Sequence, residues 1–301
     1  MLVMGLMSIF SLLSVAFVTL FERKILSYMQ LRKGPDSVGM LGVFQPFSDA
    51  LKLFSKEQNF ILKSDYYLFM ISPFTALMIS LIVWCVFPYF FNMISWFYSI
   101  LFMLMVMSIN VYPVMISGWS SNSSYSILGC IRSIAQSISY EVSFFLMVYC
   151  LLFFNSSAEM INFLVIQSYV WIIIFMFPVF IMLFISFLAE LNRTPFDFSE
   201  GESELVSGFN IEYGGSGFAF LFLSEYLNII FCGVFLAVVF LGGLTSGVGM
   251  YLKMGLIVLL VIAIRGCLPR YRYDKLMNLC WKSYLVVVLM LIPVYAGVVL
   301  I

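Results

Sequence analysis

Six acidic side chains lie within 23 residues of a chain that is otherwise rich in hydrocarbon: Glu190, Asp197, Glu200, Glu202, Glu204 and Glu212. The group begins where a long apolar run ends, and the chain of 301 residues contains only 15 Asp and Glu. Carboxylates are costly at membrane depth and usually mark ion or proton pathways there. Their concentration at one boundary therefore indicates a site that handles protons or cations, although a solvated acidic loop is the simpler alternative.

Two further carboxylates are set into predicted spans: Glu141 lies near the start of the span 137–154, and Glu225 lies inside the span 217–242. Few basic residues lie near them in the sequence, and Arg132 and Arg193 are the candidates. We therefore expect that ion pairs within this chain do not neutralise the whole set, and that several carboxyl groups share protons and titrate together. The alternative is structural, with these carboxylates serving as buried partners for the arginines.

The composition places these groups in a membrane. Hydrophobic residues make up 63% of the chain and charged residues 10%, with a mean hydropathy of +1.08, whereas soluble domains carry about 25% charge. The net charge is zero, which leaves no electrostatic footprint for nucleic acid. The chain has no histidine, no CxxC pair among its six cysteines and no glycine-rich nucleotide motif. We therefore expect no flavin, iron–sulfur cluster or metal on this chain and no nucleic-acid partner.

Eight apolar segments are long enough to cross a bilayer, whose hydrocarbon core of roughly 30 Å needs about 20 helical residues. The runs are continuously apolar and do not alternate, which favours helices over a barrel. The predicted spans are about 2–21, 66–91, 97–118, 137–154, 169–189, 217–242, 250–268 and 283–301. The predicted fold class is therefore all-α, with residues 1–301 forming a single membrane domain of eight transmembrane helices.

The basic residues sort onto alternate connections between these spans. Fourteen of the 15 Lys and Arg fall in the first, third, fifth and seventh connections, and Lys253 is the remainder. The positive-inside rule then places these four connections in the cytoplasm or matrix and both termini on the opposite side. An error of one span would scramble this sorting, so the sorting also supports the count of eight.

The first basic connection contains an amphipathic segment at residues 43–57. Its apolar residues recur at helical spacing, with Asp49, Lys52 and Lys56 between them. The pattern predicts a helix at the membrane surface. Such a helix either anchors the connection or forms one wall of an entrance for an amphipathic, lipid-soluble substrate.

The last basic connection contains a compact group formed by Arg265, Arg270, Arg272 and Lys275. A group of this kind determines topology and contacts lipid headgroups. Two sharper interpretations stay open, which are docking of an acidic soluble partner and neutralisation of the acidic cluster on the same face.

Ordered motifs run along the chain from the first predicted span to the last. They occupy residues 22–35, 45–54, 118–123, 135–141, 192–197, 200–210 and 269–274, and include ERKILSYMQLRKGP and PRYRYD. On these motifs the chain resembles the subunit 1 family of mitochondrial NADH:ubiquinone oxidoreductase, respiratory complex I. Leu191 and the pair Gly266-Cys267 depart from the family pattern, but neither departure removes a charged group.

This resemblance implies a multi-pass subunit of the mitochondrial inner membrane with both termini in the intermembrane space. The implied partners are the hydrophilic quinone-site subunits and the neighbouring small membrane subunits of complex I, together with phospholipids and ubiquinone as substrate. The implied role has no redox centre of its own. The subunit would form the membrane end of the quinone tunnel and an acidic path that couples quinone reduction to proton translocation.

The family's functional residues carry over onto charged positions of this sequence. The implied quinone-tunnel residues are Glu22, Arg23, Asp49, Lys52, Arg265 and Arg270. The implied proton-path residues are Glu141, Glu190, Asp197, Glu200, Glu202, Glu204, Glu212 and Glu225. Reduction or movement of quinone would change the protonation of the acidic groups, and the change would pass sideways through the loops.

Two other functions stay open, namely a stand-alone cation/proton antiporter and the equivalent subunit of a membrane-bound hydrogenase. Antiporter-like sequences usually place Lys and Glu in the middle of spans. In this chain Lys253 is the lysine that comes nearest to such a position. The residues assigned to the quinone side disfavour both alternatives.

Overall fold

The computed structural model describes residues 2–58, 61–87, 97–168, 170–198, 201, 208–210, 212–242 and 247–300. Within these ranges all regular structure is helical, which confirms the predicted all-α class. The α-helices are α1 (Leu2–Met29), α2 (Gln45–Ser55), α3 (Tyr66–Val83), α4 (Ser99–Ile109), α5 (Val111–Ser120), α6 (Ser124–Asn155), α7 (Met160–Ile166), α8 (Ile172–Phe175), α9 (Phe177–Glu190), α11 (Gly215–Phe240), α12 (Gly247–Cys267), α13 (Tyr273–Asn278) and α14 (Leu285–Leu300). The short 3-10 helices are η1 (Met40–Gly42), η2 (Trp84–Val86) and η3 (Gly208–Asn210), and η4 (Leu279–Tyr284) is a π-helix.

Seven helical runs among the described residues are long and apolar enough to cross a membrane. They are Met4–Met29, Tyr66–Val86, Ser99–Ser120, Ser124–Asn155, Gly215–Phe240, Gly247–Cys267 and Tyr273–Val298. The predicted span 169–189 differs, because it contains α8 and the shorter apolar helix α9, separated at Met176 with φ −117° and ψ 34°. Pro178 at the start of α9 has no N–H to donate to the preceding turn, so a continuous helix is disfavoured there.

Two predicted boundaries are wrong because polar residues do not end these helices. Helix α6 begins well before the predicted span 137–154. The hydroxyl of Ser133 in this early part donates to the carbonyl of Cys130, so the helix itself satisfies the polar group. Helix α1 continues past the predicted end of its span to Met29, since Glu22 is buried and paired rather than solvated.

Three other spans also differ in their limits. The predicted span 97–118 is divided into α4 and α5 at Asn110, just ahead of Pro113, which cannot donate a helical hydrogen bond. The last span begins at Tyr273 as a continuous run of α13, η4 and α14. The helical part of the predicted span 66–91 ends at Val86, and residues 88–96 lie outside the described residues.

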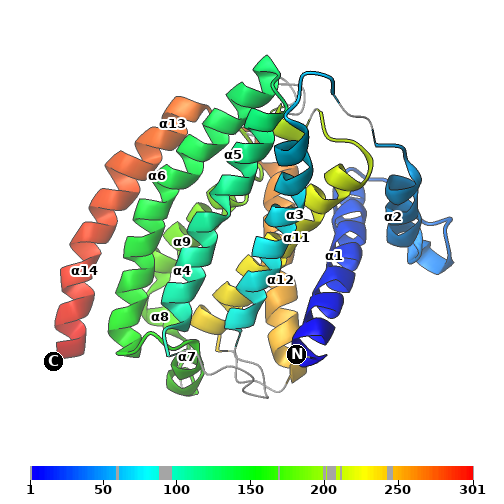
Figure 1. Ribbon diagram of the computed structural model, residues 1–301. Coiled ribbons are helices and arrows are strands. Elements are labelled where there is room, and N and C mark those ends of the chain that lie inside the picture. Colours follow the sequence, from blue (N-terminus) through cyan, green and yellow to red (C-terminus); the bar gives the residue numbers. More distant parts are fainter. Residues whose placement is uncertain are drawn as a thin grey trace.

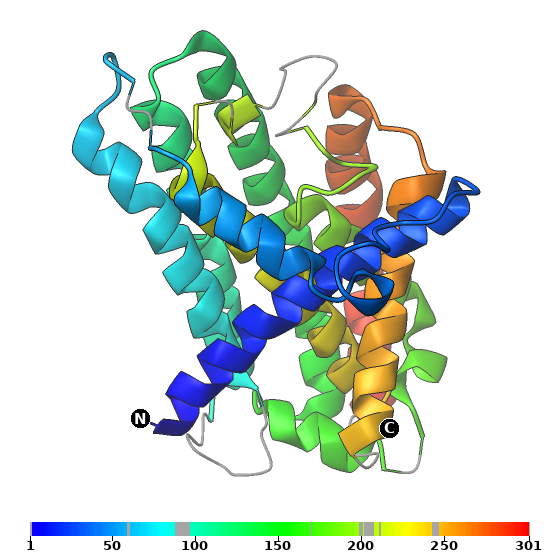
Figure 2. The ribbon, with the colours of Figure 1, turned by 90° about the vertical axis from the view of Figure 1, so that its right-hand side faces the viewer.

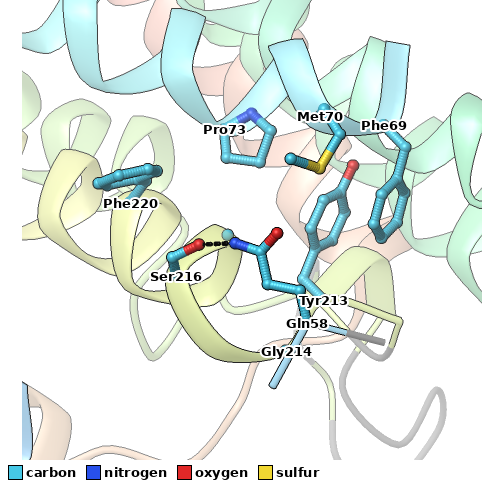
Figure 3. Close-up of a pocket in the computed structure, with 9 residues that line it drawn as sticks. Gln58, Phe69, Met70, Pro73, Tyr213, Gly214, Ser216 and Phe220 are labelled. Carbon is cyan, nitrogen blue, oxygen red and sulfur yellow. Dashed lines mark hydrogen bonds between the residues drawn. The ribbon is translucent and has the colours of Figure 1, made fainter. Parts of the chain in front are cut away.

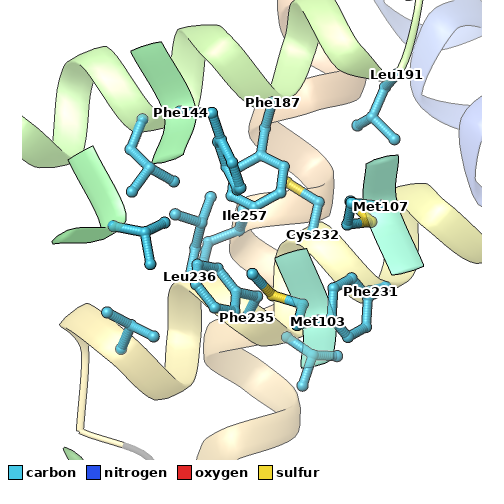
Figure 4. Packing of buried hydrophobic residues seen from close by; sticks show 14 of the residues in the cluster. Met103, Met107, Phe144, Phe187, Leu191, Phe231, Cys232, Phe235, Leu236 and Ile257 are labelled. Atoms are coloured by element: carbon cyan, nitrogen blue, oxygen red, sulfur yellow. The ribbon is translucent and has the colours of Figure 1, made fainter. Parts of the chain in front are cut away.

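Helix α11 is the central element of the bundle. It contacts α1, α2, α3, α7, α8, α9 and α12, and every residue of 226–240 is buried. Figure 4 shows Phe187 between rings of two neighbouring helices, with its centroid 4.9 Å from Phe144 and 5.5 Å from Phe235. Edge-to-face contacts of this kind add to the energy of apolar burial. The helix that carries Glu225 is therefore held rigidly from several sides.

The charged connections gather at one end of the bundle. Both termini lie at the bottom of Figure 1, whereas α2 and α13 lie at the top. The described parts of the connections α1–α3, α9–α11 and α12–α13 also lie at this upper end. These described parts hold Asp49, Asp197, Glu212 and many of the basic residues, so the fold brings several of the predicted site residues to the same end.

The amphipathic helix predicted at 43–57 is confirmed as α2, which packs against α1 and α11. Figure 2 shows α2 lying across the upper half of the oblique helix α1. Phe54 of α2 contacts Phe220 of α11, with ring centroids 6.1 Å apart. Gly215 begins α11 at φ +58°, a conformation that favours glycine, and faces the carbonyl of Lys56 just after α2. These contacts fix the end of α2 against the start of α11.

Candidate functional site

The carboxylate of Glu22 lies at the centre of a buried polar group formed by α1, α11 and α12. Glu22 is only 5% exposed, although it is ionisable and lies near the end of a helix. Arg265 of α12 donates a hydrogen bond to its Oε1, and the hydroxyl of Tyr226 of α11 donates to its Oε2 at 2.6 Å. Both carboxylate oxygens therefore have a donor, which offsets the cost of removing the charge from water.

Arg193 brings a second cation to this group. Its guanidinium lies over the ring of Tyr226, 4.7 Å from the centroid, and its Nη2 is 3.6 Å from Oε2 of Glu225. Arg193 and Tyr226 are each 7% exposed, so the cation–π contact is largely shielded from water. The contacts run from Arg265 through Glu22, Tyr226 and Arg193 to Glu225, and these five residues are the buried cluster.

The end of α9 directs Arg193 into the buried cluster. Asn192 follows the helix in the left-handed conformation, with φ 50°. The N–H of Asn192 donates to the carbonyl of Ala189 at 3.2 Å, and the N–H of Arg193 donates to that of Leu188 at 3.3 Å. This pair of bonds is a Schellman motif, in which asparagine takes the place usually held by glycine. The chain therefore leaves α9 with Arg193 turned towards α11.

A second charged contact joins α1 to α2. Nη1 of Arg23 is 2.6 Å from Oδ2 of Asp49, and Oδ1 of Asp49 accepts a hydrogen bond from Gln45 at 3.0 Å. The side chains of Arg23 and Asp49 are 53% and 33% exposed, and such pairs contribute only about 0–1 kcal/mol to stability. Lys52 of the same helix is exposed, and no ion pair joins it to a described residue. The fold thus brings Arg23 and Asp49 together and leaves Lys52 apart.

A third contact joins the acidic connection to the last basic one. Nη2 of Arg270 is 3.3 Å from Oδ2 of Asp197, which is buried. Beside this pair, the N–H of Tyr271 donates to the carbonyl of Pro195 at 2.9 Å, and the ring of Tyr271 lies 5.5 Å from that of Phe196. One interpretation of the last basic connection was that it neutralises the acidic cluster. The ion pair between Arg270 and Asp197 confirms this interpretation for these two residues.

Glu141 of α6 and Glu190 at the end of α9 are placed differently. No ion pair joins either of them to a residue in the described part of the chain. The atom Oε1 of Glu141 is buried. Glu190 also lines a polar cleft between α5 and α6, together with Asn110, Ser133, Ser137 and Asn192.

The other predicted acidic residues are placed only in part. Glu200, Glu202 and Glu204 lie outside the described residues. Glu212 is half-buried near the start of α11, and no ion pair joins it to the residues the structure describes. Among those same residues, no three His, Cys, Asp or Glu side chains gather as a metal ion would require.

Sequence reasoning missed Tyr226 and did not assign Arg193 to Glu225. A tyrosine within an apolar run is usually a core residue, so Tyr226 gave no distinct signal. The available clue was that Tyr226 directly follows Glu225 in the sequence. Consecutive side chains of a helix point about 100° apart, so these two polar side chains can face different neighbouring elements.

An apolar pocket lies apart from these charges, where α3 meets the start of α11 (Figure 3). Tyr213 stacks on Phe69 with centroids 4.2 Å apart, and its hydroxyl forms a 2.9 Å hydrogen bond with Ser72. Burial raises the pKa of Tyr213 above its ordinary value. Gln58 donates a hydrogen bond to Ser216 in the same pocket. No predicted site residue lines this pocket.

Comparison with known proteins agrees with the resemblance drawn from the motifs. The family whose sequence pattern matches residues 2–296 is described as NADH dehydrogenase. The chain belongs to this family. It is 53% identical over 274 residues to NADH-ubiquinone oxidoreductase chain 1 of Locusta migratoria, covering 91% of this chain and 87% of that protein. The corresponding protein of Aedes aegypti is 50% identical over 91% of this chain and 88% of its own length. That of Artemia franciscana is 47% identical over 94% of each.

Removal of the cation beside Glu22 tests the buried cluster. Replacing Arg265 by leucine leaves a buried carboxylate with one donor fewer, and such losses cost about 3–5 kcal/mol. We expect the lower end of this range, because the side chain of Arg265 is 36% exposed. Glu22→Gln combined with Arg265→Leu should restore part of the loss, since no unpaired charge then remains. Thermal unfolding of the detergent-solubilised protein measures each step.

The matched control for this series is Arg272→Leu. Arg272 pairs with Asp274 at 2.9 Å, and both side chains are mostly exposed, at 79% and 65%. Its removal should cost only about 0–1 kcal/mol. Equal destabilisation by Arg265→Leu and Arg272→Leu would contradict the buried pair.

Proposed function

We propose that this chain is a core membrane subunit of NADH:ubiquinone oxidoreductase, respiratory complex I, in the mitochondrial inner membrane. The observation that carries the proposal is its similarity, over 91% of the chain, to relatives named chain 1 of that enzyme. Seven membrane-length runs, with α8 and α9 as a further crossing, support eight spans. Both termini then lie in the intermembrane space. The flavin and iron–sulfur centres belong to other subunits, to which this one is joined.

The quinone passage is proposed at the upper end of α1, α2 and α11. Ubiquinone has a polar head and an apolar tail, so its path needs apolar walls with a few polar groups. A cleft beside the buried cluster combines Val18 and Ile229 with Glu22 and Arg265. The helix α2 extends this wall, since it packs on both α1 and α11.

The remaining tunnel residues lie near the start of this path. The pair Arg23–Asp49 joins α1 to α2 and offers a cation and an anion at its partly exposed edge. Lys52 lies on the same helix, and Arg270 binds Asp197 where the acidic connection begins. We propose that these four residues guide the quinone head, while the apolar face of α2 accepts the tail.

The acidic path is proposed to run from Asp197 and Glu225 to Glu190 and Glu141, and to include Glu200, Glu202, Glu204 and Glu212 of the connection between α9 and α11 in the sequence. Reduction of quinone consumes protons and changes the charge at the tunnel. The paired carboxylates respond through their arginines, whereas Glu141 and Glu190 respond by exchanging protons, because no ion pair holds them within the described part of the chain. The change then leaves this subunit sideways through α5 and α6.

The first test of the proposal is co-migration. Gently solubilised source membranes are separated by native electrophoresis, stained for NADH oxidation and searched for this chain by mass spectrometry. We expect the chain in the large NADH-oxidising band. Migration alone or as a small oligomer without that activity would favour a stand-alone cation/proton antiporter instead.

The acidic path predicts a specific loss of coupled activity. Glu141→Gln and Glu190→Gln should each lower NADH:quinone reductase turnover by roughly tenfold or more, since a positioned proton-transfer group contributes about 100-fold or more. Oxidation of NADH by an artificial acceptor should stay unchanged, because it does not need the membrane path. Glu159→Gln is the matched control, since Glu159 precedes α7 at the opposite end. Normal quinone turnover and proton pumping in both variants would exclude the path.

The quinone passage predicts a change in apparent affinity. Asp49→Asn weakens the contact with Arg23, and we expect the KM for quinone to rise about 2- to 5-fold, the range that corresponds to loss of an exposed ion pair. The kcat should change little, because the reducing centre lies elsewhere. Asp36→Asn alters a carboxylate in the same connection outside the passage and should leave the KM unchanged. A normal KM in Asp49→Asn would remove Asp49 from the passage.

A further inference from the structure

Tyr226 contacts both halves of the buried cluster. Its hydroxyl donates to Oε2 of Glu22 at 2.6 Å, on the side assigned to quinone. The guanidinium of Arg193 lies over the face of its ring, 4.7 Å from the centroid. Nη2 of Arg193 is 3.6 Å from Oε2 of Glu225, a residue assigned to the proton path. The side chain of Tyr226 therefore links Glu22, which was assigned to the quinone passage, to Glu225, which was assigned to the proton path, with Arg193 between Tyr226 and Glu225.

The ring of Tyr226 is held in a fixed position. It belongs to the continuously buried part of α11, is 7% exposed, and lies against Phe222 with centroids 6.2 Å apart. A ring with so little free space cannot move away from Arg193 without disturbing the core. Its hydroxyl, by contrast, can change role without movement of the ring, because a phenol is both donor and acceptor.

The charges in the buried cluster are balanced as two pairs. Arg265 and Arg193 supply two cations, and Glu22 and Glu225 supply two carboxylates. If Glu22 takes up a proton, its O–H can donate to the Tyr226 hydroxyl, and the hydrogen bond reverses. The two guanidinium groups then face one carboxylate, so the cluster gains positive charge. That charge acts on the carboxyl groups farther along the proposed path, beyond Glu225, and favours their loss of a proton.

We propose that Tyr226 is a positioning residue that couples the charge of Glu22 to that of Glu225, by holding the Glu22 carboxylate with its hydroxyl and the Arg193 guanidinium with its ring. Uptake of a proton by Glu22 then promotes release of a proton from carboxyl groups beyond Glu225 on the acidic path. The inference rests on the proposed function, because it assigns these two sides to quinone and to protons.

A double-mutant cycle tests this coupling in the assembled complex. Tyr226→Phe removes the hydroxyl and keeps the ring, and Glu225→Gln removes the second carboxylate. We expect each to lower NADH:quinone turnover, and the double variant to depart from the product of the single effects by about 3-fold or more, as residues linked in one salt-bridge network do. Tyr213→Phe is the matched control, because its buried hydroxyl bonds to serines instead of a carboxylate. In the double variant Tyr213→Phe with Glu225→Gln, the fold reduction in turnover should equal the product of the two single reductions.

The outcomes separate this inference from the proposed function. Assembly is checked first by co-migration and by NADH oxidation with an artificial acceptor. Normal quinone turnover in Glu225→Gln and Glu22→Gln would overturn the site assignments themselves. Impaired single variants whose effects multiply would overturn only the coupling through Tyr226. If Tyr226→Phe does not assemble, the cycle of Glu22→Gln with Glu225→Gln decides the question, and independent effects there overturn the proposal.

Discussion

A carboxylate removed from water must be matched by donors, and in this chain that requirement at Glu22 determines how three helices meet. Glu22 comes from α1, Arg265 from α12 and Tyr226 from α11. Loss of any donor leaves a charge that the surroundings cannot solvate. The upper ends of the three helices are thus tied at a common point, and Arg193 extends this point to Glu225.

The distribution of polar groups follows from the surrounding solvent. Outer helices such as α14 expose apolar side chains, for example Met290 at 69%, which suits contact with lipid. Charges would be expensive on those faces, so they are concentrated in the connections at one end. Within that end the carboxylates divide into two kinds. Those paired with arginine hold helices and connections together, whereas no ion pair joins Glu141 or Glu190 to a described residue.

Local sequence patterns predicted the helices well where a single physical feature, amphipathic spacing or continuous apolarity, determined their position. The amphipathic period identified α2, and continuous apolar runs identified the long helices. The limits of α1 and α6 could not be predicted in the same way, because hydropathy treats every polar residue as solvated. Glu22 is instead paired inside the bundle, and Ser133 is satisfied by its own helix. The break at Met176 also needed the local conformation ahead of Pro178.

The sequence by itself determined the membrane class, the helical fold, the collection of charges in alternate connections and the residues that could carry protons. These properties depend on composition and on short-range spacing, which the order of residues contains directly. Only the tertiary structure decided which carboxylates have partners. Glu22 and Arg265 are 243 positions apart, and Tyr226 is 204 positions from Glu22. Pairing over such separations depends on how helices cross in space, and no local pattern records that crossing.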